Sequence, residues 1–282
     1  MKLRKLGNSG LQVSLIGLGC NNFNWQIDLE QSRKVMHKAM DLGITLFDTA
    51  DVYGLMGGSE TAMGQIMGDR RKDIILATKC GLPMDKEGLL QGASRRYIMS
   101  AVEASLRRLK TDWIDLYQIH VYDPNTPIEE TLRALDDLVR SGKVRYIGCS
   151  SFPSWRELLP AAQAYNMGLL PYFPLASGAL TGKYKRNAPM PEGARLTSVQ
   201  RLADKYLGDA QWAKIEGLEK FCAERGRSMV ELSFSWLAAR PQVSSIIAGA
   251  TKPEQLEMNV KSAGWALSAE DLAAIDKITA PA

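Results

Sequence analysis

Three successive apolar segments of this sequence are each followed by a residue that can carry charge or move a proton. These residues are, in order, Asp48, Lys79 and His120. If the segments are neighbouring parallel strands, the three side chains converge on one rim, where the catalytic groups of (β/α) barrels lie. Each residue alone is explained equally well as a turn, a solvated strand end or a half-buried histidine. Three such residues after three successive strands together predict a functional site.

Tyr53 lies five residues after Asp48, on the loop that would follow the same strand. A phenol with a pKa of about 10 is a weak acid at neutral pH. The ammonium of Lys79 would lower that pKa, and the carboxylate of Asp48 would keep the ammonium charged. With His120 orienting a carbonyl, the four residues predict proton transfer to a carbonyl oxygen. Such a site needs a bound hydride donor.

The elements that must position these residues are visible as short apolar runs of four to eight residues without polar alternation. Such runs are typical of strands buried on both faces. We predict strands at Leu15–Cys20, Ile44–Phe47, Ile74–Thr78, Ile114–Ile119, Val144–Cys149, Met167–Tyr172 and Val243–Ala248. Stretches with helical periodicity separate or follow them, and we predict helices at Asp28–Leu42, Ser94–Leu109, Ile128–Val139, Trp155–Tyr165, Asp209–Arg225 and Ser228–Ala239.

Alternation of strands and helices predicts a parallel sheet, in either a doubly wound fold or a (β/α)8 barrel. No Gly-x-Gly-x-x-Gly opens a helix after a strand, so the dinucleotide fingerprint of the doubly wound fold is absent. We therefore expect an α/β fold, the (β/α)8 barrel, as a single domain over residues 1–282. Residues 2–14 predict a β-hairpin that plugs one barrel end, and Ser177–Leu207 predicts a long loop beside the site.

Composition excludes several classes of protein. The 282 residues are 45% hydrophobic and 23% charged, which is typical of a globular chain. A net charge of +4 without long basic runs gives no support to nucleic-acid or membrane binding. No segment reads as a signal peptide or a transmembrane helix. The four cysteines have no Cys-x-x-Cys spacing, so we expect free thiols, no metal site and a cytoplasmic location.

The sequence resembles the aldo-keto reductase family over nearly its whole length. The motifs that carry the resemblance are Gly43-Ile44-Thr45-Leu46-Phe47-Asp48-Thr49-Ala50, Tyr53-Gly54, Ser59-Glu60, Thr78-Lys79, Asp112 to His120, Lys143 to Ser150 and Leu180-Thr181-Gly182-Lys183-Tyr184. The resemblance implies a barrel that transfers hydride from a nicotinamide cofactor, usually NADPH, to small aldehydes or ketones. It implies that Tyr53 is the general acid, Lys79 its pKa modulator, Asp48 the partner of Lys79, and His120 the carbonyl-orienting residue.

The resemblance also implies where NADP(H) lies. Ser150 and its neighbour Ser151 would meet the nicotinamide carboxamide, and Tyr172 would stack on the ring. The pyrophosphate would follow Pro174, Leu175, Gly182 and Lys183, and the adenosine end would meet Gly249, Ala250, Thr251, Lys252, Gln255 and Asn259. Lys252 could bind a 2′-phosphate as a point charge, which favours NADP, or could be a solvated loop lysine.

The sequence departs from the family pattern at two cofactor positions. Ser151 stands where the family usually has asparagine, which weakens an expected amide contact. Met258 stands where a glutamate is common, which puts the adenine contact in doubt.

The largest departure is a short connection. Only 17 residues separate Cys149 from Met167, where family members carry a further helix and the sixth strand with a glutamine for the carboxamide. We expect that this helix and strand are missing from the chain at a junction between Trp155 and Arg156. A barrel without them has an unpaired edge. Its carboxamide pocket would be incomplete and its activity weakened.

Two other functions remain open. The same fold could be an NADP(H)-binding sensor or regulatory module with little turnover, as channel β-subunits of this family are thought to be. A lyase or isomerase could use Lys79 as a Schiff-base nucleophile, although Asp48 would keep that lysine protonated. Trp25 and Tyr122 are candidate walls of the substrate pocket, or packing residues. The sequence names no particular substrate and predicts no oligomeric state.

Overall fold

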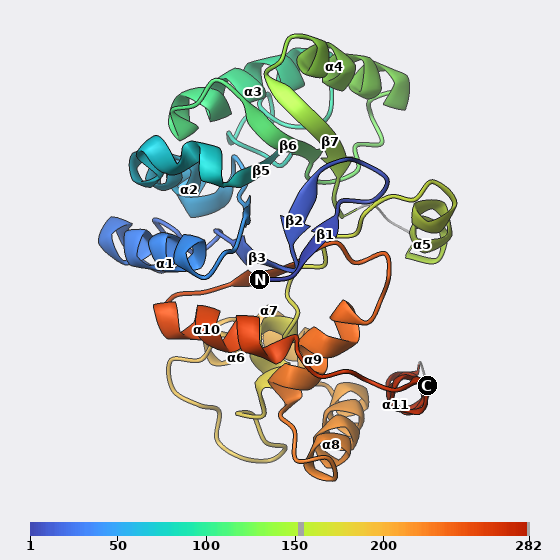
Figure 1. Ribbon diagram of the computed structural model, residues 1–282. Helices are drawn as coiled ribbons and strands as arrows, with labels where there is room; N and C mark the ends of the chain where they lie inside the picture. Colours follow the sequence, from blue (N-terminus) through green and yellow to red (C-terminus); the bar gives the residue numbers. More distant parts are fainter. Residues whose placement is uncertain (152–154, 281–282) are drawn as a thin grey trace.

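A parallel sheet forms the centre of the molecule. The computed structural model describes residues 1–151 and 155–280 (Figure 1). Six strands pair in parallel in the order β7-β6-β5-β4-β3-β8. Their bounds are β3 Ile16–Gly19, β4 Leu46–Asp48, β5 Ile75–Cys80, β6 Ile114–Ile119, β7 Val144–Cys149 and β8 Ile246–Gly249. The sheet curves as in a (β/α)8 barrel, as predicted.

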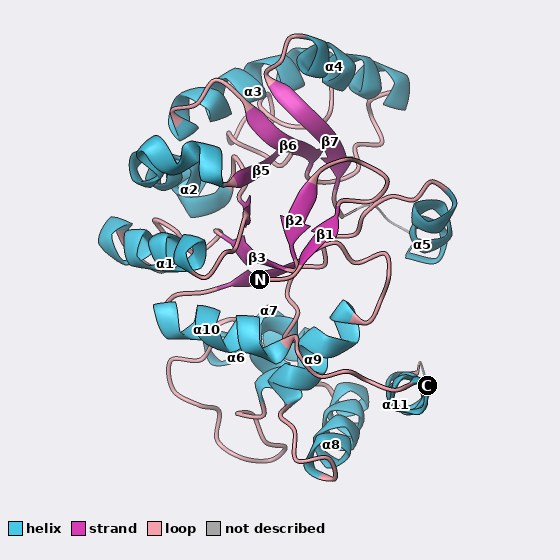
Figure 2. Cartoon of the chain, in the orientation of Figure 1, coloured by secondary structure: helices cyan, strands magenta, loops and turns pink. Residues whose placement is uncertain are grey.

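Helices follow the strands and cover the outer face of the sheet (Figure 2). On the first half of the chain these are α1 (Leu29–Asp41), α2 (Tyr53–Met67), α3 (Arg95–Leu109) and α4 (Ile128–Arg140). Side chains of Asp28 and Ser94 accept backbone N–H groups at the starts of α1 and α3, which explains where these helices begin. Their apolar faces pack on the outer face of the strands in one continuous core.

A two-stranded hairpin closes one end of the barrel, as predicted. Strands β1 (Leu3–Lys5) and β2 (Gln12–Ser14) pair antiparallel. Fully buried Val13 packs in a cluster with Leu46, Leu116 and Ile247, which belong to three strands of the sheet. The hairpin therefore seals the interior opposite the rim that carries Asp48.

The sheet does not continue beyond β7. The predicted strand Met167–Tyr172 forms only two isolated bridges to the β8 side, Leu169 with Val243 and Tyr172 with Ile247, so its prediction as a regular strand is wrong. Between β7 and this segment the described residues contain one helix, α5 (Trp155–Ala164), and no strand. Because no strand lies between β7 and this segment, each has a free edge. The described residues therefore form neither a sixth strand nor a further helix before it, as expected.

The segment predicted as one long loop, Ser177–Leu207, contains three short helical pieces. They are η2 (Ala176–Thr181), α6 (Arg195–Ser198) and α7 (Gln200–Tyr206). Buried Tyr184 accepts the backbone N–H of Leu196 at 3.2 Å, and both side chains join a second apolar core under α8 (Asp209–Ala223) and α9 (Met229–Ala238). This burial orders a segment whose sequence lacks periodicity.

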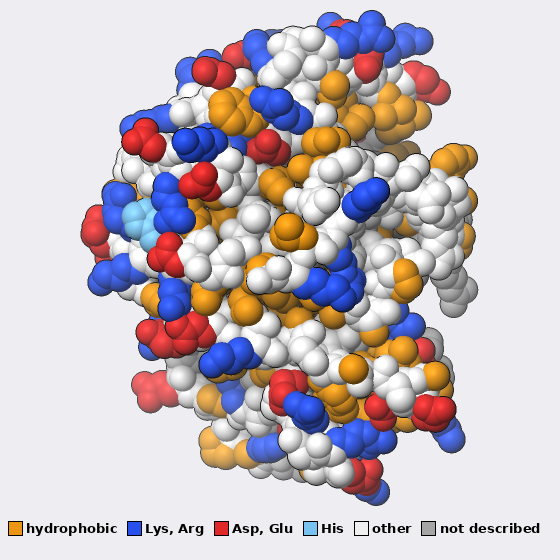
Figure 3. Space-filling model, viewed as in Figure 1, with side chains coloured by type: hydrophobic (Ala, Val, Ile, Leu, Met, Phe, Trp, Pro, Cys, Tyr) orange, Lys and Arg blue, Asp and Glu red, His pale blue; other side chains and the backbone are white. Residues whose placement is uncertain are grey.

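Four further helical elements among the described residues were not foreseen from the sequence: α2, η1 (Gly68–Asp73), α10 (Pro253–Ser262) and α11 (Ala269–Thr279). No described helix is both long and apolar enough to cross a membrane. On the face seen in Figure 3, basic and acidic side chains are interspersed and do not form a single patch.

Candidate active site

Asp48 and Lys79 form a buried ion pair at the carboxyl ends of two neighbouring strands. Asp48 ends β4, and Lys79 lies next to last in β5, whose Ala77 is paired with Asp48. The Lys79 Nζ donates to Asp48 Oδ2 at 2.6 Å and to the carbonyl oxygen of Thr49 at 2.8 Å. Both side chains are almost wholly buried. The pair is therefore fixed in position.

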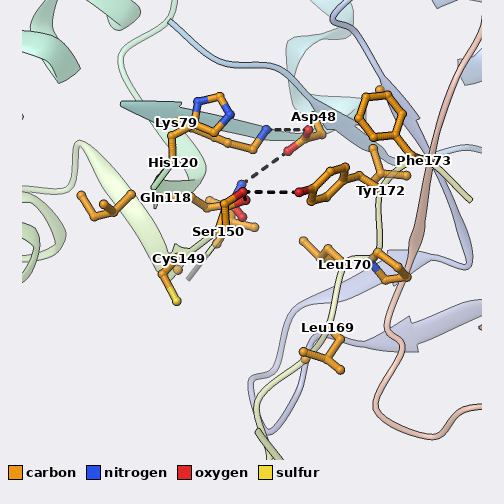
Figure 4. A pocket seen from close by; sticks show the side chains of 18 of the residues that line it. Asp48, Lys79, Gln118, His120, Cys149, Ser150, Leu169, Leu170, Tyr172 and Phe173 are labelled. Carbon is orange, nitrogen blue, oxygen red and sulfur yellow. Dashed lines mark hydrogen bonds and ion pairs between the residues drawn. The ribbon is translucent and has the colours of Figure 1, made fainter. Parts of the chain in front are cut away.

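Tyr53, the first residue of α2, and His120, which directly follows β6, complete the cluster. The Tyr53 Oη lies 3.4 Å from His120 Nε2, and the two rings meet edge to face at 5.5 Å. The Lys79 Nζ lies 5.1 Å from the centre of the Tyr53 ring. The four side chains predicted from the sequence thus lie within contact of one another, as Figure 4 shows for three of them.

Burial decides the protonation of the two hydrogen-bonding groups. Burial raises the pKa of Tyr53, and although the Lys79 ammonium acts to lower it, the net shift is upward. Lys79 thus acts on this pKa in the expected direction, but burial, which the sequence does not reveal, has the larger effect. Burial and then the Lys79 charge lower the pKa of His120 to about 3. At neutral pH the site presents a neutral imidazole and a protonated phenol.

Lys79 stays charged despite its burial. Burial acts to lower the pKa of Lys79, but the Asp48 carboxylate and Tyr53 together outweigh it, and the pKa is raised. A charged lysine is a poor nucleophile, so the arrangement disfavours the Schiff-base alternative. It suits the stabilisation of negative charge on a nearby oxygen.

A large cavity opens beside the cluster. Its volume is about 2470 Å³, against the roughly 300–1,000 Å³ usual for small-molecule sites. Predicted cofactor and substrate residues that line it are Ser150, Ser151, Tyr172, Pro174, Leu175, Lys183, Gly249, Thr251, Gln255, Asn259 and Tyr122. Lys252 lines an adjoining cavity of about 760 Å³ together with Thr251. Gly182, buried Ala250 and exposed Trp25 are not among the residues lining either cavity.

The cavity continues into the gap in the barrel. Figure 4 shows Leu169 and Leu170 across an open space from Cys149, the last residue of β7. Above that space, Ser151 Oγ lies 3.4 Å from Tyr172 Oη. Tyr172 is 56% exposed. The part of the site predicted to hold the nicotinamide therefore borders the missing strand.

The far end of the cavity is shaped by the loop before α10. The Gln255 Oε1 accepts the backbone N–H groups of Thr251 at 2.8 Å and of Lys252 at 3.3 Å. Gln31 donates to the carbonyl oxygen of Thr251 at 2.9 Å. The oxygen of Gln255 thus holds this loop.

Three residues at the site were missed in the sequence. Gln118 donates through Nε2 to Asp48 Oδ1 at 3.4 Å, and strand alternation could have revealed it because positions 118 and 120 share one face. Ser177 lines the cavity, and its buried Oγ has no hydrogen-bond partner among the described residues. Arg195 donates to Asn22 Oδ1 at 3.1 Å. This contact joins segments that are distant in the sequence, so no local pattern predicts it.

Comparison with known proteins gives the family. The model of the aldo/keto reductase family matches residues 15–156 and 154–280. The chain belongs to this family. Aldo/keto reductases are oxidoreductases that act on small carbonyl compounds and generally use a nicotinamide cofactor.

Individual relatives cover almost the entire chain. L-glyceraldehyde 3-phosphate reductase of Escherichia coli K12 is 33% identical, over 98% of this chain and 92% of its own length. A probable voltage-gated potassium channel subunit beta of Oryza sativa is 34% identical, over 93% and 91%. The structure is similar to the aldo-keto reductase AKR11C1 from Bacillus halodurans in its holo form, with a TM-score of 0.80, 30% identity and 99% and 96% coverage.

The comparisons also bear on the short connection after β7. The alignment with the Escherichia coli reductase spans 320 positions, which is 38 more than the 282 residues of this chain. That aldo/keto reductase therefore has residues without a counterpart here. The family match is divided into two pieces that meet at residues 154–156. The predicted junction lies there, beside residues 152–154, which are outside the described residues.

Proposed function

We propose that this aldo/keto reductase reduces aldehydes or ketones to alcohols with NADPH, as one catalytic domain. The observation that carries the proposal is the buried cluster of Asp48, Tyr53, Lys79 and His120 at the carboxyl ends of three adjacent strands. A carbonyl oxygen placed between the phenol and the imidazole would meet two hydrogen-bond donors. Proton donation there completes a reduction that begins with hydride transfer.

The proposed roles follow from the protonation states. The Tyr53 hydroxyl donates the proton to the developing alkoxide, because its raised pKa keeps the proton on the oxygen until then. The neutral His120 ring orients the carbonyl through the same oxygen. The charged Lys79, held by Asp48, stabilises the phenolate that remains. Gln118 steadies the other oxygen of Asp48.

The described residues fit a nicotinamide cofactor at most of its length. The cavity is large enough for a dinucleotide, and the unpartnered Ser177 Oγ on its wall offers a polar contact. A bound cofactor would supply the hydride. Ser150, Ser151 and Tyr172 would hold the nicotinamide end, Pro174, Leu175 and Lys183 the pyrophosphate, and Gly249, Thr251 and Asn259 the adenosine end.

The preference for NADP over NAD is supported by the charge of the adjoining cavity. Lys252, Lys34 and Arg195 line it, and no described acidic residue except Glu254 does. Three cations at this end would favour a ligand that carries an additional phosphate. Part of the proposed preference therefore rests on Lys252, as the resemblance implied.

The test is consumption of NADPH with a panel of small aldehydes and ketones, followed at 340 nm. The purified protein should first give the intact mass of 31.1 kDa, so that any activity belongs to the chain with the short connection. We expect turnover with NADPH and weaker turnover with NADH. Binding of NADPH without consumption across the panel would contradict the proposal.

The open side of the barrel favours one second candidate, an NADP(H)-binding module with little turnover. Ser151 and Tyr172 border the gap, so a nicotinamide held there would be poorly fixed relative to Tyr53. A similar protein is named as a potassium channel subunit beta. Quenching of protein fluorescence by NADPH, with no oxidation of the cofactor, would support this candidate.

A further inference from the structure

A second carboxyl group is buried directly behind the candidate site and has no part in the proposed reaction. Asp51 is 1% exposed and lies two residues before Tyr53. Its Oδ2 accepts the hydroxyl of Tyr97, on α3, at 3.2 Å. Its Oδ1 is buried without a hydrogen-bond partner among the described residues. Its backbone N–H donates to the carbonyl oxygen of Lys79 at 3.0 Å.

The surroundings of Asp51 offer it no cation of its own. The titratable and charged groups that face it are Glu60 on α2, Tyr97 and Arg108 on α3, Cys80 on β5 and Tyr117 on β6. Arg108 is committed to Glu60, whose Oε2 accepts its Nε at 2.7 Å. The other oxygen of Glu60 accepts the hydroxyl of Thr78 at 2.6 Å. A charge on Asp51 would therefore be unpaired and beside a second carboxylate.

The segment that directly follows Tyr53 is held in an unfavourable backbone conformation. Gly54, Leu55 and Met56 all have positive φ angles, of 68°, 63° and 63°. For Leu55 and Met56 this left-handed conformation is unfavourable and persists only where the surroundings impose it. A side chain at Gly54 would collide with the backbone of Ser59 and Phe23. On the side before Tyr53, the loop is held by Thr49, whose Oγ1 lies 2.8 Å from Ser59 Oγ, and by the contacts of Asp51.

We propose that Asp51 is a positioning residue for Tyr53: its protonated carboxyl, bonded to Tyr97, keeps the loop in its buried place, and ionisation puts an unpaired charge there that favours displacement of the loop. The inference rests on the proposed function for its kinetic consequence. Asp51 reaches the reaction only through the backbone, because Tyr53 and His120 carry the groups that would meet substrate. We therefore expect the reductase to be more active when Asp51 is protonated than when it is ionised.

The electrostatics place this ionisation near neutral pH. Burial, and then the nearby Glu60, raise the pKa of Asp51 to about 7. Since the unfolded chain has an aspartate pKa of about 4, the protonated form is favoured by folding. The resulting stability is complete below about pH 4 and is lost as the pH rises to about 7. Above that range the wild type carries the full cost of the buried charge.

The experiment compares kcat and kcat/KM between pH 5.5 and 9 in the wild type, Asp51→Asn, Asp51→Ala and Tyr97→Phe. For the wild type we expect a fall in kcat as the pH rises through about 7. Asparagine still accepts from Tyr97 but cannot ionise, so Asp51→Asn should keep the rate at pH 6 within about twofold and lack the step near 7. Asp51→Ala should lower kcat about tenfold at all pH values with little change in KM, and Tyr97→Phe should have a smaller effect of the same kind.

A second measurement separates failure of this proposal from failure of the proposed function. Thermal unfolding requires no turnover, and Asp51→Asn should gain in midpoint temperature relative to the wild type between pH 5 and pH 8. An equal difference at both pH values, or an unchanged kinetic step near 7 in Asp51→Asn, would overturn the role of Asp51. If the wild type consumes no NADPH but the unfolding difference grows with pH, the role of protonated Asp51 stands and the reductase assignment fails.

Discussion

The two sides of this barrel differ in how completely they are built. From β3 to β6 every strand has a neighbour on both sides, and Asp48, Lys79 and His120 are each less than 10% exposed. From β7 to the segment at Leu169–Tyr172 there is an open edge, and residues of β7 alternate between covered and exposed. Ile147, in the middle of β7, is 41% exposed. We call β3 to β6 the complete side, and β7 with the segment at Leu169–Tyr172 the open side. The proposed chemistry lies on the complete side. The proposed nicotinamide contacts lie where the two sides meet.

The proposed proton-transfer groups depend only on the strands and helices next to them. Asp48, Lys79 and His120 lie at the carboxyl ends of consecutive strands, each covered by its own helix, so loss of a later unit leaves their geometry intact. The proposed carboxamide contacts would depend on the neighbour of β7 instead. The complete side should therefore determine the rate of the chemical step, and the open side the affinity for cofactor.

The strongest way to test this division is Tyr53→Phe. Removing the phenol hydroxyl deletes the proton donor, and general acids contribute about 10²–10⁴-fold to a rate. We expect turnover to fall by that factor while the Kd for NADPH stays within about twofold, because Tyr53 belongs to the complete side. Steady-state kinetics and fluorescence titration measure the two quantities.

Tyr122→Phe is a suitable control for Tyr53→Phe, since Tyr122 lines the same cavity outside the cluster. It should retain most of the turnover. Wild-type turnover in Tyr53→Phe would remove this residue from the acid role. A loss of cofactor affinity as large as the loss of turnover would show that the two sides are not separable.

A smaller effect is expected from a pair of substitutions that compares packing on the two sides. Leu76 of β5 is fully buried in the core, whereas Ile147 of β7 is 41% exposed. Leu76→Ala should lower the free energy of unfolding by about 2–5 kcal/mol. Ile147→Ala, the matched variant at the open edge, should cost less than about 1 kcal/mol. Urea unfolding measures both, and equal costs would mean that β7 is covered in solution.

The sequence predicted the parallel sheet, the hairpin and the four residues of the cluster because these follow from local patterns. Asp48, Lys79 and His120 each mark the end of an apolar run, and the shared rim follows from the parallel arrangement. The break in the strand series after Cys149 was also visible as a short spacing. These features need no knowledge of contacts between distant segments.

Other features depend on contacts that no local pattern encodes. The segment around Tyr184 is ordered by burial against α8 and α9, so its short helices were missed. The net upward shift of the Tyr53 pKa reflects how deeply the ring is buried, which the spacing to Lys79 does not reveal. Met167–Tyr172 has strand composition, but a strand needs neighbours on which to pair, and here one is missing.

A further test of the difference between the two sides is to restore the missing strand on the open side. Inserting between Trp155 and Arg156 the corresponding segment of the Bacillus subtilis aldo-keto reductase YhdN, which is 34% identical to this chain, would give β7 a neighbour. A restored contact to the carboxamide of about 1.4 kcal/mol would lower the Kd for NADPH about tenfold. The pH dependence set by Asp51 should not change, because that residue lies on the complete side.

The matched control for this insertion is a Gly/Ser segment of equal length at the same junction, which supplies chain but no strand. It should leave the Kd for NADPH unchanged or weaken it. If both insertions tighten binding equally, the gain comes from relief of the short connection and not from pairing with β7. If neither does, the cofactor is held without the sixth strand, and the open side of this barrel is a complete binding site in its own right.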